Sequence, residues 1–284
     1  MMMNDHWNKE KLLPIEQYVK EVMGFDYTGH DIYHAQRVQR QAQQLHLLLS
    51  QQLQSCSQCD IETLISSLFR YHQNEQQRWI QSLKSVLHLQ GLSLNILSLY
   101  KVSLSLCPHD VQCGLQALTL EEWEYYRDVM AYLHDCIDDK FFKDEQKTEQ
   151  LAKLRSFLQK ETSFSSDVID ILLREMQQLS YHKNCKEKQA LSLAAQFVQD
   201  ADYLDALGAI GIARTFAYGS CHQQGLYSPD FSLYNGKRTS LQHFHDKLYH
   251  LDTVMNTQAA YTLAQERIDW MRQFEAQFLK EWEG

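Results

Sequence analysis

The chain contains an adjacent histidine and aspartate, His134 and Asp135, directly after the apolar run Val129–Leu133. An imidazole nitrogen and a carboxylate oxygen placed side by side can bind the same metal ion. Because a buried charge is costly unless it is paired or bound to a metal, the apolar setting makes this pair a candidate site. The dipeptide alone is weak evidence, since the chain has three more such pairs: His30-Asp31, His109-Asp110 and His245-Asp246.

Two further residues, His34 and Asp200, also lie in segments with the apolar periodicity of helices. Together with His134 and Asp135 they would make a mixed nitrogen and oxygen ligand set. Such a set suits Mn²⁺, Mg²⁺ or Fe²⁺ better than a structural thiolate zinc site. A metal held in this way activates water and polarises a phosphoryl oxygen, which favours hydrolysis of phosphate esters or anhydrides. A packed or surface histidine remains the alternative, because the spacing does not show that these segments meet.

The composition predicts a helical protein. The 284 residues include only 10 glycines and 3 prolines, and both residue types are common in turns and between strands. The predicted helices are Leu13–Met23, Ile32–Ser50 with Asp31 as N-cap, one from about Leu120, Lys147–Gln159, Asp167–Tyr181, Gln189–Tyr218, one from Thr239 or Ser240, and one capped by Asn256-Thr257 that runs to about Trp282. A loop is predicted over Gly219–Lys237.

The net charge and the cysteine content limit which partners and which cell compartment we expect for this protein. The net charge of −9 argues against a nonspecific grip on nucleic acid. Seven scattered cysteines are typical of reduced thiols in the cytoplasm. The polar segment Met1–Lys11 does not resemble a signal peptide, and no stretch reaches the roughly 18 apolar residues of a membrane span. We therefore expect a cytoplasmic protein that binds neither nucleic acid nor membrane.

The segment from about 47 to 118 does not fit a simple bundle, where connections are usually about 2–8 residues long. Phe69–Leu89 has a helical pattern, whereas Leu92–Ile96 and Val102–Leu106 alternate as strands do. Its cysteines allow a zinc clip or, in the simpler interpretation, reduced thiols without a metal: Cys56, Cys59, Cys107 and Cys113.

Three segments resemble the motifs of bacterial HD-domain phosphohydrolases. His30–Val38 is similar to their opening signature, with His34 as first ligand, and Leu133–Lys140 is similar to their central motif. Gln199–Phe216 is the most specific segment, and it resembles the small cytosolic branch associated with nucleotide hydrolysis and pyrophosphohydrolysis. The resemblance covers about residues 10–46 and 120–284, including the tail motifs Thr239-Ser240, Met255–Thr257 and Glu281–Gly284.

This resemblance implies a single all-α HD-domain helical bundle over residues 1–284, with an insertion of uncertain structure at about 47–118. It implies that one divalent cation is bound, with Mn²⁺ favoured over Mg²⁺, Fe²⁺ and Ni²⁺. The implied ligands are His34, His134, Asp135 and Asp200. The other three His-Asp pairs are then a helix-entry turn and two surface pairs.

The resemblance also implies roles around the metal. Asp138 and Asp139 would orient or deprotonate the attacking water, with Asp138 preferred as the base, and a solvated helix end is the alternative. Lys140 next to them would meet a phosphate, or else be a surface lysine. Arg37, one turn after His34, has a similar role. Arg214 would lie about 21 Å from Asp200 along a straight helix, and so would support the core or reach a distal part of the substrate.

The implied activity is hydrolysis of nucleoside or deoxynucleoside triphosphates to a monophosphate and pyrophosphate. Two alternatives stay open at this point: a nucleoside monophosphate phosphatase, and a non-catalytic nucleotide-sensing module. A glycine-rich phosphate loop is absent from the sequence, which disfavours a P-loop mechanism. The expected partners are a small phosphorylated substrate and a second copy of the chain in a homodimer.

Overall fold

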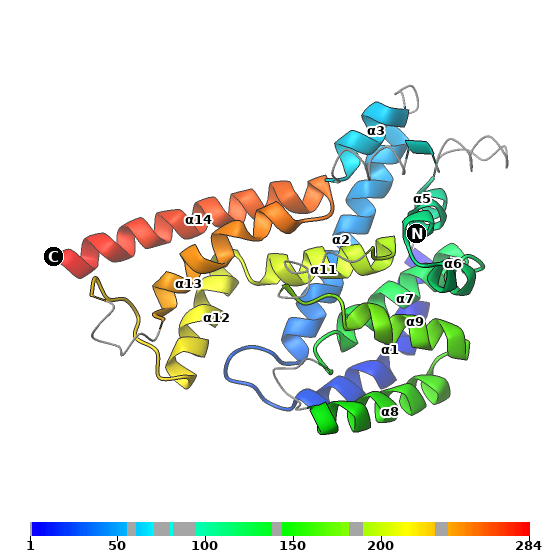
Figure 1. Cartoon of the computed structure of the whole chain (residues 1–284), viewed down its shortest axis with the longest axis horizontal. Helices are drawn as coiled ribbons and strands as arrows, with labels where there is room; N and C mark the ends of the chain where they lie inside the picture. Colours follow the sequence, from blue (N-terminus) through cyan, green and yellow to red (C-terminus); the bar gives the residue numbers. More distant parts are fainter. Residues whose placement is uncertain are drawn as a thin grey trace.

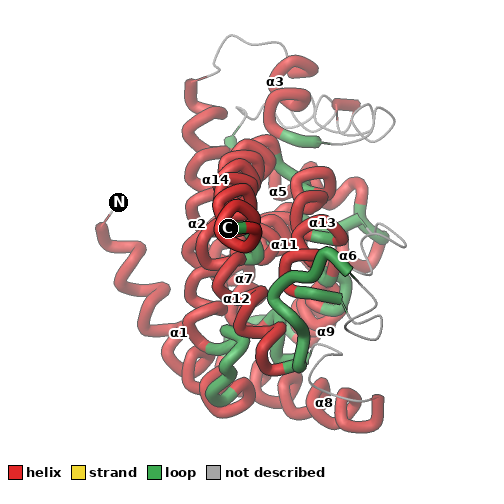
Figure 2. The backbone as a smooth tube through the Cα atoms, turned by 90° about the vertical axis from the view of Figure 1, so that its left-hand side faces the viewer, coloured by secondary structure: helices red, strands yellow, loops and turns green. Residues whose placement is uncertain are grey.

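The computed structural model describes residues 2–55, 61–70, 80–81, 95–137, 144–181, 190–230 and 238–284. Within these ranges every regular element is a helix, and a lone antiparallel bridge joins Phe69 to Thr257. Figure 2 accordingly draws helices and loops and no strand among the described residues. The predicted all-α class is confirmed. In the same ranges, no helix combines the length and the apolar character that crossing a membrane requires.

Three helices form the centre of the bundle: α2 (Ile32–Ser55), α7 (Leu120–Leu133) and α11 (Leu193–Asp205). Each packs against the other two, and Figure 1 shows α11 crossing α2 near the middle of the molecule. The buried apolar residues of α2, among them Val38, Ala42 and Leu45, recur at intervals of three or four, so that they form one stripe facing the core. The ligands predicted from the sequence lie on or directly after these three central helices.

The other helices cover this centre. Helix α1 (Met2–Met23) packs on α7 and α2, and α8 (Asp144–Glu161) packs on α9 (Ser166–Met176). A further group packs with the long helix α14 (Gln258–Glu283): α12 (Gly208–Cys221), α13 (Ser240–Asp246) and the 3₁₀ helix η3 (Leu248–Val254). The long helix α14 runs outward from α11 to the end of the chain (Figure 1).

The helix starts follow the predicted caps. Asp31 accepts hydrogen bonds from the amides of Tyr33 and His34, and Thr257 accepts one from Ala260. Thr119 and Glu122 form a reciprocal capping box at the start of α7. Thr239 caps α13, as predicted. These local signals succeed because a cap needs only residues within one turn of the helix.

The prediction of one continuous helix over 189–218 is wrong. The chain forms α11 and α12 instead, with a sharp turn between Asp205 and Gly208. Leu207 is extended, with φ −114° and ψ 165°, and Gly208 has φ +71°, a left-handed conformation that glycine adopts at little cost. The turn changes the direction of the chain, so α12 does not continue the axis of α11 (Figure 1). The predicted loop after it also begins later, because α12 continues to Cys221.

The segment predicted as an insertion contributes helices wherever it is described: α3 (Ile61–Leu68), α5 (Ile96–Ser103), the 3₁₀ helix η1 (Leu104–Leu106) and α6 (His109–Leu115). The alternating pattern of Ile96 and of Val102–Leu106 therefore does not correspond to strands. Asn95 caps α5, whose Leu99 and Tyr100 are buried against the core, and this cap and burial outweigh the alternating pattern. Most of the predicted helix Phe69–Leu89, Leu92, Leu94, Cys56 and Cys59 lie outside the described residues.

Candidate metal centre

Three of the predicted ligands converge at the centre of the bundle. His34 lies in the first turns of α2, and His134 and Asp135 directly follow α7. One ligand atom from each lies within 4.8 Å of the other two. Nε2 of His34 is 3.1 Å from Nε2 of His134 and 3.2 Å from Oδ2 of Asp135. The side chains of both histidines are at most 4% exposed, so the cluster is almost entirely protein-enclosed.

The other ring nitrogen of each histidine has its own partner. Nδ1 of His134 lies 2.8 Å from the carbonyl oxygen of Ala131, and Nδ1 of His34 lies 2.7 Å from Oδ2 of Asp205. A ring that donates from Nδ1 carries its lone pair on Nε2. Both lone pairs then face the same point, beside a carboxylate. This donor set fits a divalent cation, and acceptors at the other nitrogen usually orient metal-bound histidines.

The structure does not bring Asp200 to this cluster. Its carboxylate is buried and accepts hydrogen bonds from the two residues directly before α14: the amide and side chain of Asn256 at 2.7 and 3.0 Å, and the amide and hydroxyl of Thr257 at 2.9 and 2.8 Å. Burial raises the pKa of Asp200 to about 6 in spite of these bonds, which lower it. Asp200 therefore fastens α14 to α11.

Asp202, two residues further along α11, lies at the cluster instead. Its Oδ1 is 3.5 Å from Nε2 of His34 and 3.7 Å from Nε2 of His134. Successive residues of a helix are about 100° apart, so Asp200 and Asp202 point to nearly opposite faces. Asp205 follows Asp202 by three residues and shares its face. That spacing is the signal by which Asp202 and Asp205 could have been found together in the sequence.

Asp205 is a junction between the cluster and two arginines. Arg37 contacts it with two hydrogen bonds, Nε to Oδ1 at 2.7 Å and Nη2 to Oδ2 at 3.0 Å. Arg214 donates from Nη1 to Oδ2 at 2.7 Å. This contact depends on the turn at Gly208, because the turn brings the Arg214 guanidinium close to Asp205 and His34. The predicted substrate residue Arg37 thus has its guanidinium on Asp205.

Electrostatics at the cluster favour a positive charge. Burial by itself would lower the pKa of His34, but the carboxylates of Asp135, Asp202 and Asp205 raise it to about 10. Burial would raise the pKa of Asp202, but the two histidines hold it well below its ordinary value. Asp202 and Asp205 therefore stay ionised near neutral pH, and a divalent cation would replace the proton that His34 otherwise carries.

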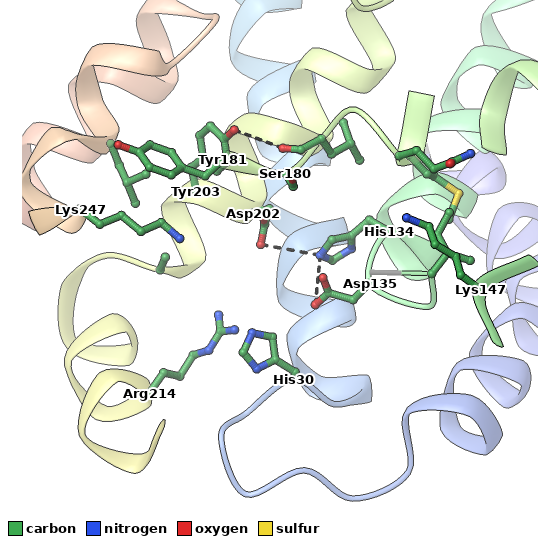
Figure 3. Close-up of a pocket in the computed structure, with 16 residues that line it drawn as sticks. His30, His134, Asp135, Lys147, Ser180, Tyr181, Asp202, Tyr203, Arg214 and Lys247 are labelled. Carbon is green, nitrogen blue, oxygen red and sulfur yellow. Dashed lines mark hydrogen bonds and ion pairs between the residues drawn. The ribbon is translucent and has the colours of Figure 1, made fainter. Parts of the chain in front are cut away.

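A cavity of about 130 Å³ opens over the cluster, with His134, Asp135 and Asp202 in its wall. Figure 3 shows three cationic side chains around this wall: Arg214 from α12, Lys247 before η3, and Lys147 from α8 on the other side. His30 and two tyrosines also lie in this wall. The Tyr203 hydroxyl donates to the Leu179 carbonyl, and the Tyr181 ring lies 5.0 Å from the Lys247 ammonium. Sequence reasoning identified Arg214 for substrate contact, but it missed Lys147 and Lys247.

The acidic pair Asp138 and Asp139 and the neighbouring Lys140 lie outside the described residues. Of the remaining His-Asp pairs, His109-Asp110 and His245-Asp246 lie away from the cluster. Asp110 pairs with Arg174, and Nε2 of His245 lies 2.5 Å from Glu275. His30 lies at the edge of the metal cavity, in the turn that leads into α2.

Comparison with known proteins places this geometry in a shared fold. No protein-family model matches the chain. A segment of 97 residues is 43% identical to the uncharacterized protein YpgQ of Bacillus subtilis, which is 34% of this chain and 44% of YpgQ. The matched segment thus spans less than half of that relative.

Two crystal structures align over nearly the whole chain. One is a Lactobacillus plantarum protein, with 24% identity, a TM-score of 0.59, and coverage of 96% of this chain and 97% of that chain. The other is Bacillus subtilis YpgQ in complex with ADP, with 22% identity, a TM-score of 0.52, and coverage of 96% of both chains. The fold is shared with both.

Proposed function

We propose that this chain is a divalent-metal-dependent phosphohydrolase of the HD-domain kind that acts on nucleotides. The observation that carries the proposal is the meeting of His34, His134 and Asp135 from distant parts of the chain beneath a cavity surrounded by cations. The motif resemblance points to the same activity. The likeness to YpgQ, a protein crystallised with ADP, supports a nucleotide as ligand.

The proposed metal ligands are His34, His134 and Asp135, with Asp202 as the fourth in place of Asp200. Asp202 is favoured because its carboxylate faces both Nε2 atoms, whereas that of Asp200 is occupied by α14. When bound, a divalent cation supplies a Lewis acid that activates water and polarises a phosphoryl oxygen. The mixed imidazole and carboxylate set favours Mn²⁺.

The cations of the wall would bind the phosphates. Lys247 and Lys147 stand on opposite sides of the cluster, and Arg214 lies between it and α12 (Figure 3). Three cations spread in this way suit a polyphosphate chain better than a single phosphate, because each can meet a different phosphoryl group. This favours a nucleoside triphosphate, with water attacking the α-phosphorus and pyrophosphate leaving. Asp138 stays the proposed base, with Asp139 and Lys140 beside it, on the strength of the motif.

The test is a release assay for phosphate and pyrophosphate with nucleoside mono-, di- and triphosphates, in Mn²⁺ and in Mg²⁺. We expect pyrophosphate from triphosphates with Mn²⁺, and loss of that activity in His134→Ala and Asp135→Ala. His245→Ala and Asp246→Ala are matched controls, because they alter an exposed His-Asp pair and should keep full activity.

The outcomes separate the alternatives. Phosphate release from monophosphates alone would assign a nucleotidase. Tight nucleotide binding without turnover in any metal would assign a sensing module. Full activity after His134→Ala and Asp135→Ala would show that hydrolysis does not occur at the proposed metal site, whichever substrate is hydrolysed.

A further inference from the structure

A second, larger cavity opens beside Asp205, and its wall shares no residue with that of the metal cavity. It is open to solvent, and its volume is about 630 Å³. Ligand pockets usually span about 300–1,000 Å³, so the volume suits a molecule as large as a nucleotide. The wall comes from α2, from the turn between α11 and α12, and from α14. The proposed hydrolysis does not use this cavity, although the motif segments, Arg37 included, supply part of its wall.

Two arginines in this wall lack a carboxylate partner. Arg40 is exposed on α2, and Arg267 is half-buried on α14, and among the described residues neither forms an ion pair. Nη1 of Arg267 donates to the carbonyl oxygen of Leu204. Burial lowers the pKa of Arg267, although the charges of Asp205 and Glu266 raise it. Asp205 and Glu266 lie in the same wall, but Arg267 forms an ion pair with neither, so an anion in the cavity would offset the cost of withdrawing its guanidinium from water.

The same wall carries an apolar surface beside the arginines. Trp270 is 52% exposed and Ile210 is 47% exposed, so both offer apolar surface to a ligand in the cavity. Trp270 follows Arg267 by three residues, so the two lie on one face of α14. The Trp270 indole offers a surface on which the planar ring of a ligand can stack. The phosphates of the same ligand would then lie within reach of the neighbouring guanidinium groups.

The start of α12 adds to the positive potential of this cavity. Gly208 and Ala209 lie in the wall, and the N-cap residue Leu207 makes no side-chain cap hydrogen bond. Amides in the first turn of a helix lack helical partners and carry the positive end of its dipole. Their contribution has the same sign as that of Arg40 and Arg267.

We propose that this second cavity binds a nucleotide-sized organic anion, with its phosphates at Arg40 and Arg267 and its planar ring on Trp270. The proposal goes beyond the proposed function, because the cavity would bind its ligand even if the metal cluster hydrolysed nothing. Arg37 lies in the same wall and holds Asp205, which contacts His34. A ligand phosphate would therefore compete with Asp205 for Arg37, which connects the two sites.

The experiment is calorimetric titration of the full chain in EDTA with ATP and, separately, with tripolyphosphate, which has no ring. EDTA removes the divalent metal, so hydrolysis does not enter the measurement. We expect Trp270→Ala to weaken ATP binding about tenfold and to leave tripolyphosphate unchanged. Arg40→Glu should weaken both ligands about tenfold. Both positions are exposed, and circular dichroism would verify that the variants fold.

Matched controls come from α14 outside the cavity. Trp282→Ala removes a tryptophan that is 49% exposed, and Arg272→Glu reverses an arginine that is 60% exposed, and neither should alter binding. The proposal is overturned if neither ligand binds in EDTA, or if Arg40→Glu and Trp270→Ala bind ATP like the unaltered chain. The second result would place the bound ATP at Arg214, Lys147 and Lys247. A failure of hydrolysis in Mn²⁺ leaves this binding test intact.

Discussion

Oδ2 of Asp205 lies 2.7 Å from Nδ1 of His34 and holds this ring with its Nε2 toward Nε2 of His134. Asp205 is itself held by Arg37 and Arg214. Three helices thereby meet at one carboxylate, since His34 and Arg37 belong to α2, Asp205 to α11 and Arg214 to α12. The orientation of the first proposed ligand depends on residues outside the cluster itself.

The first prediction concerns this contact. Asp205→Asn keeps the shape of the side chain but removes the charge that orients and polarises the His34 ring. We expect the affinity for Mn²⁺ to fall about 10- to 100-fold, as is usual when such supporting partners are lost. Calorimetric titration with Mn²⁺ measures the change. Asp269→Asn, at a carboxylate of α14 that is 66% exposed, is the control. Equal affinities for both variants would contradict the role of Asp205.

The second prediction separates Asp202 from Asp200. Asp202→Ala should reduce Mn²⁺ affinity at least about tenfold. Asp200→Ala should leave one Mn²⁺ site per chain but cost about 3 kcal/mol in the free energy of unfolding, because four hydrogen bonds to the start of α14 lose their acceptor. Calorimetry and urea unfolding of the metal-free chain measure the two quantities. Loss of the metal site in a folded Asp200→Ala protein, with Asp202→Ala unaffected, would restore Asp200 as the ligand.

The third prediction concerns the turn that returns Arg214 to Asp205. Gly208 has φ +71°, and a Cβ there would lie 3.2 Å from Cγ of Arg267. We expect Gly208→Ala to lower the free energy of unfolding by about 1–2 kcal/mol from backbone strain, with a further cost from crowding. Gly24→Ala is the matched variant, because Gly24 has φ +61° but nothing within 4 Å of the added Cβ. It should show the strain alone, and a larger loss at Gly24 than at Gly208 would refute the crowding.

The fourth prediction is a pH dependence of stability that comes from His46. Burial, and then the charge of Arg127, lower the pKa of His46 to about 3, although Glu124 lies 3.5 Å from its Nε2. Below about pH 6.5 the His46 imidazole is protonated in the unfolded chain but stays neutral in the folded chain. Stability is therefore present above that pH and is lost as the pH falls, by up to about 1.4 kcal/mol per pH unit.

Urea unfolding at pH 7, 6 and 5 tests this sign with His46→Gln as the comparison. The variant should lose less stability on acidification than the unaltered chain. His243, whose pKa burial lowers to about 4, titrates in both proteins and cancels in the difference. Parallel pH profiles for the two proteins would exclude a contribution from His46.

Most helices could be predicted from local signals in the sequence, namely cap residues and apolar stripes. Asp31, Thr239 and Thr257 begin helices as expected, because a cap and an apolar stripe need only neighbours within a turn or two. The alternating pattern around Val102–Leu106 failed, since short apolar runs fit a buried helix as well as a strand. The break before Gly208 was missed because a glycine within a helical pattern has no obligatory conformation until the packing selects one.

The sequence by itself determined the all-α class and the residue types of the metal cluster, with His34, His134 and Asp135 on apolar segments that had to be buried. Only the tertiary structure decided which carboxylates of α11 meet these residues. Asp200 and Asp202 differ by two positions, and the packing of α11 between α2 and α14 turns one toward the histidines and the other toward Thr257. Which of the two aspartates faces the histidines depends on the rotation of α11 about its axis relative to its neighbours. Composition and motifs do not specify that rotation.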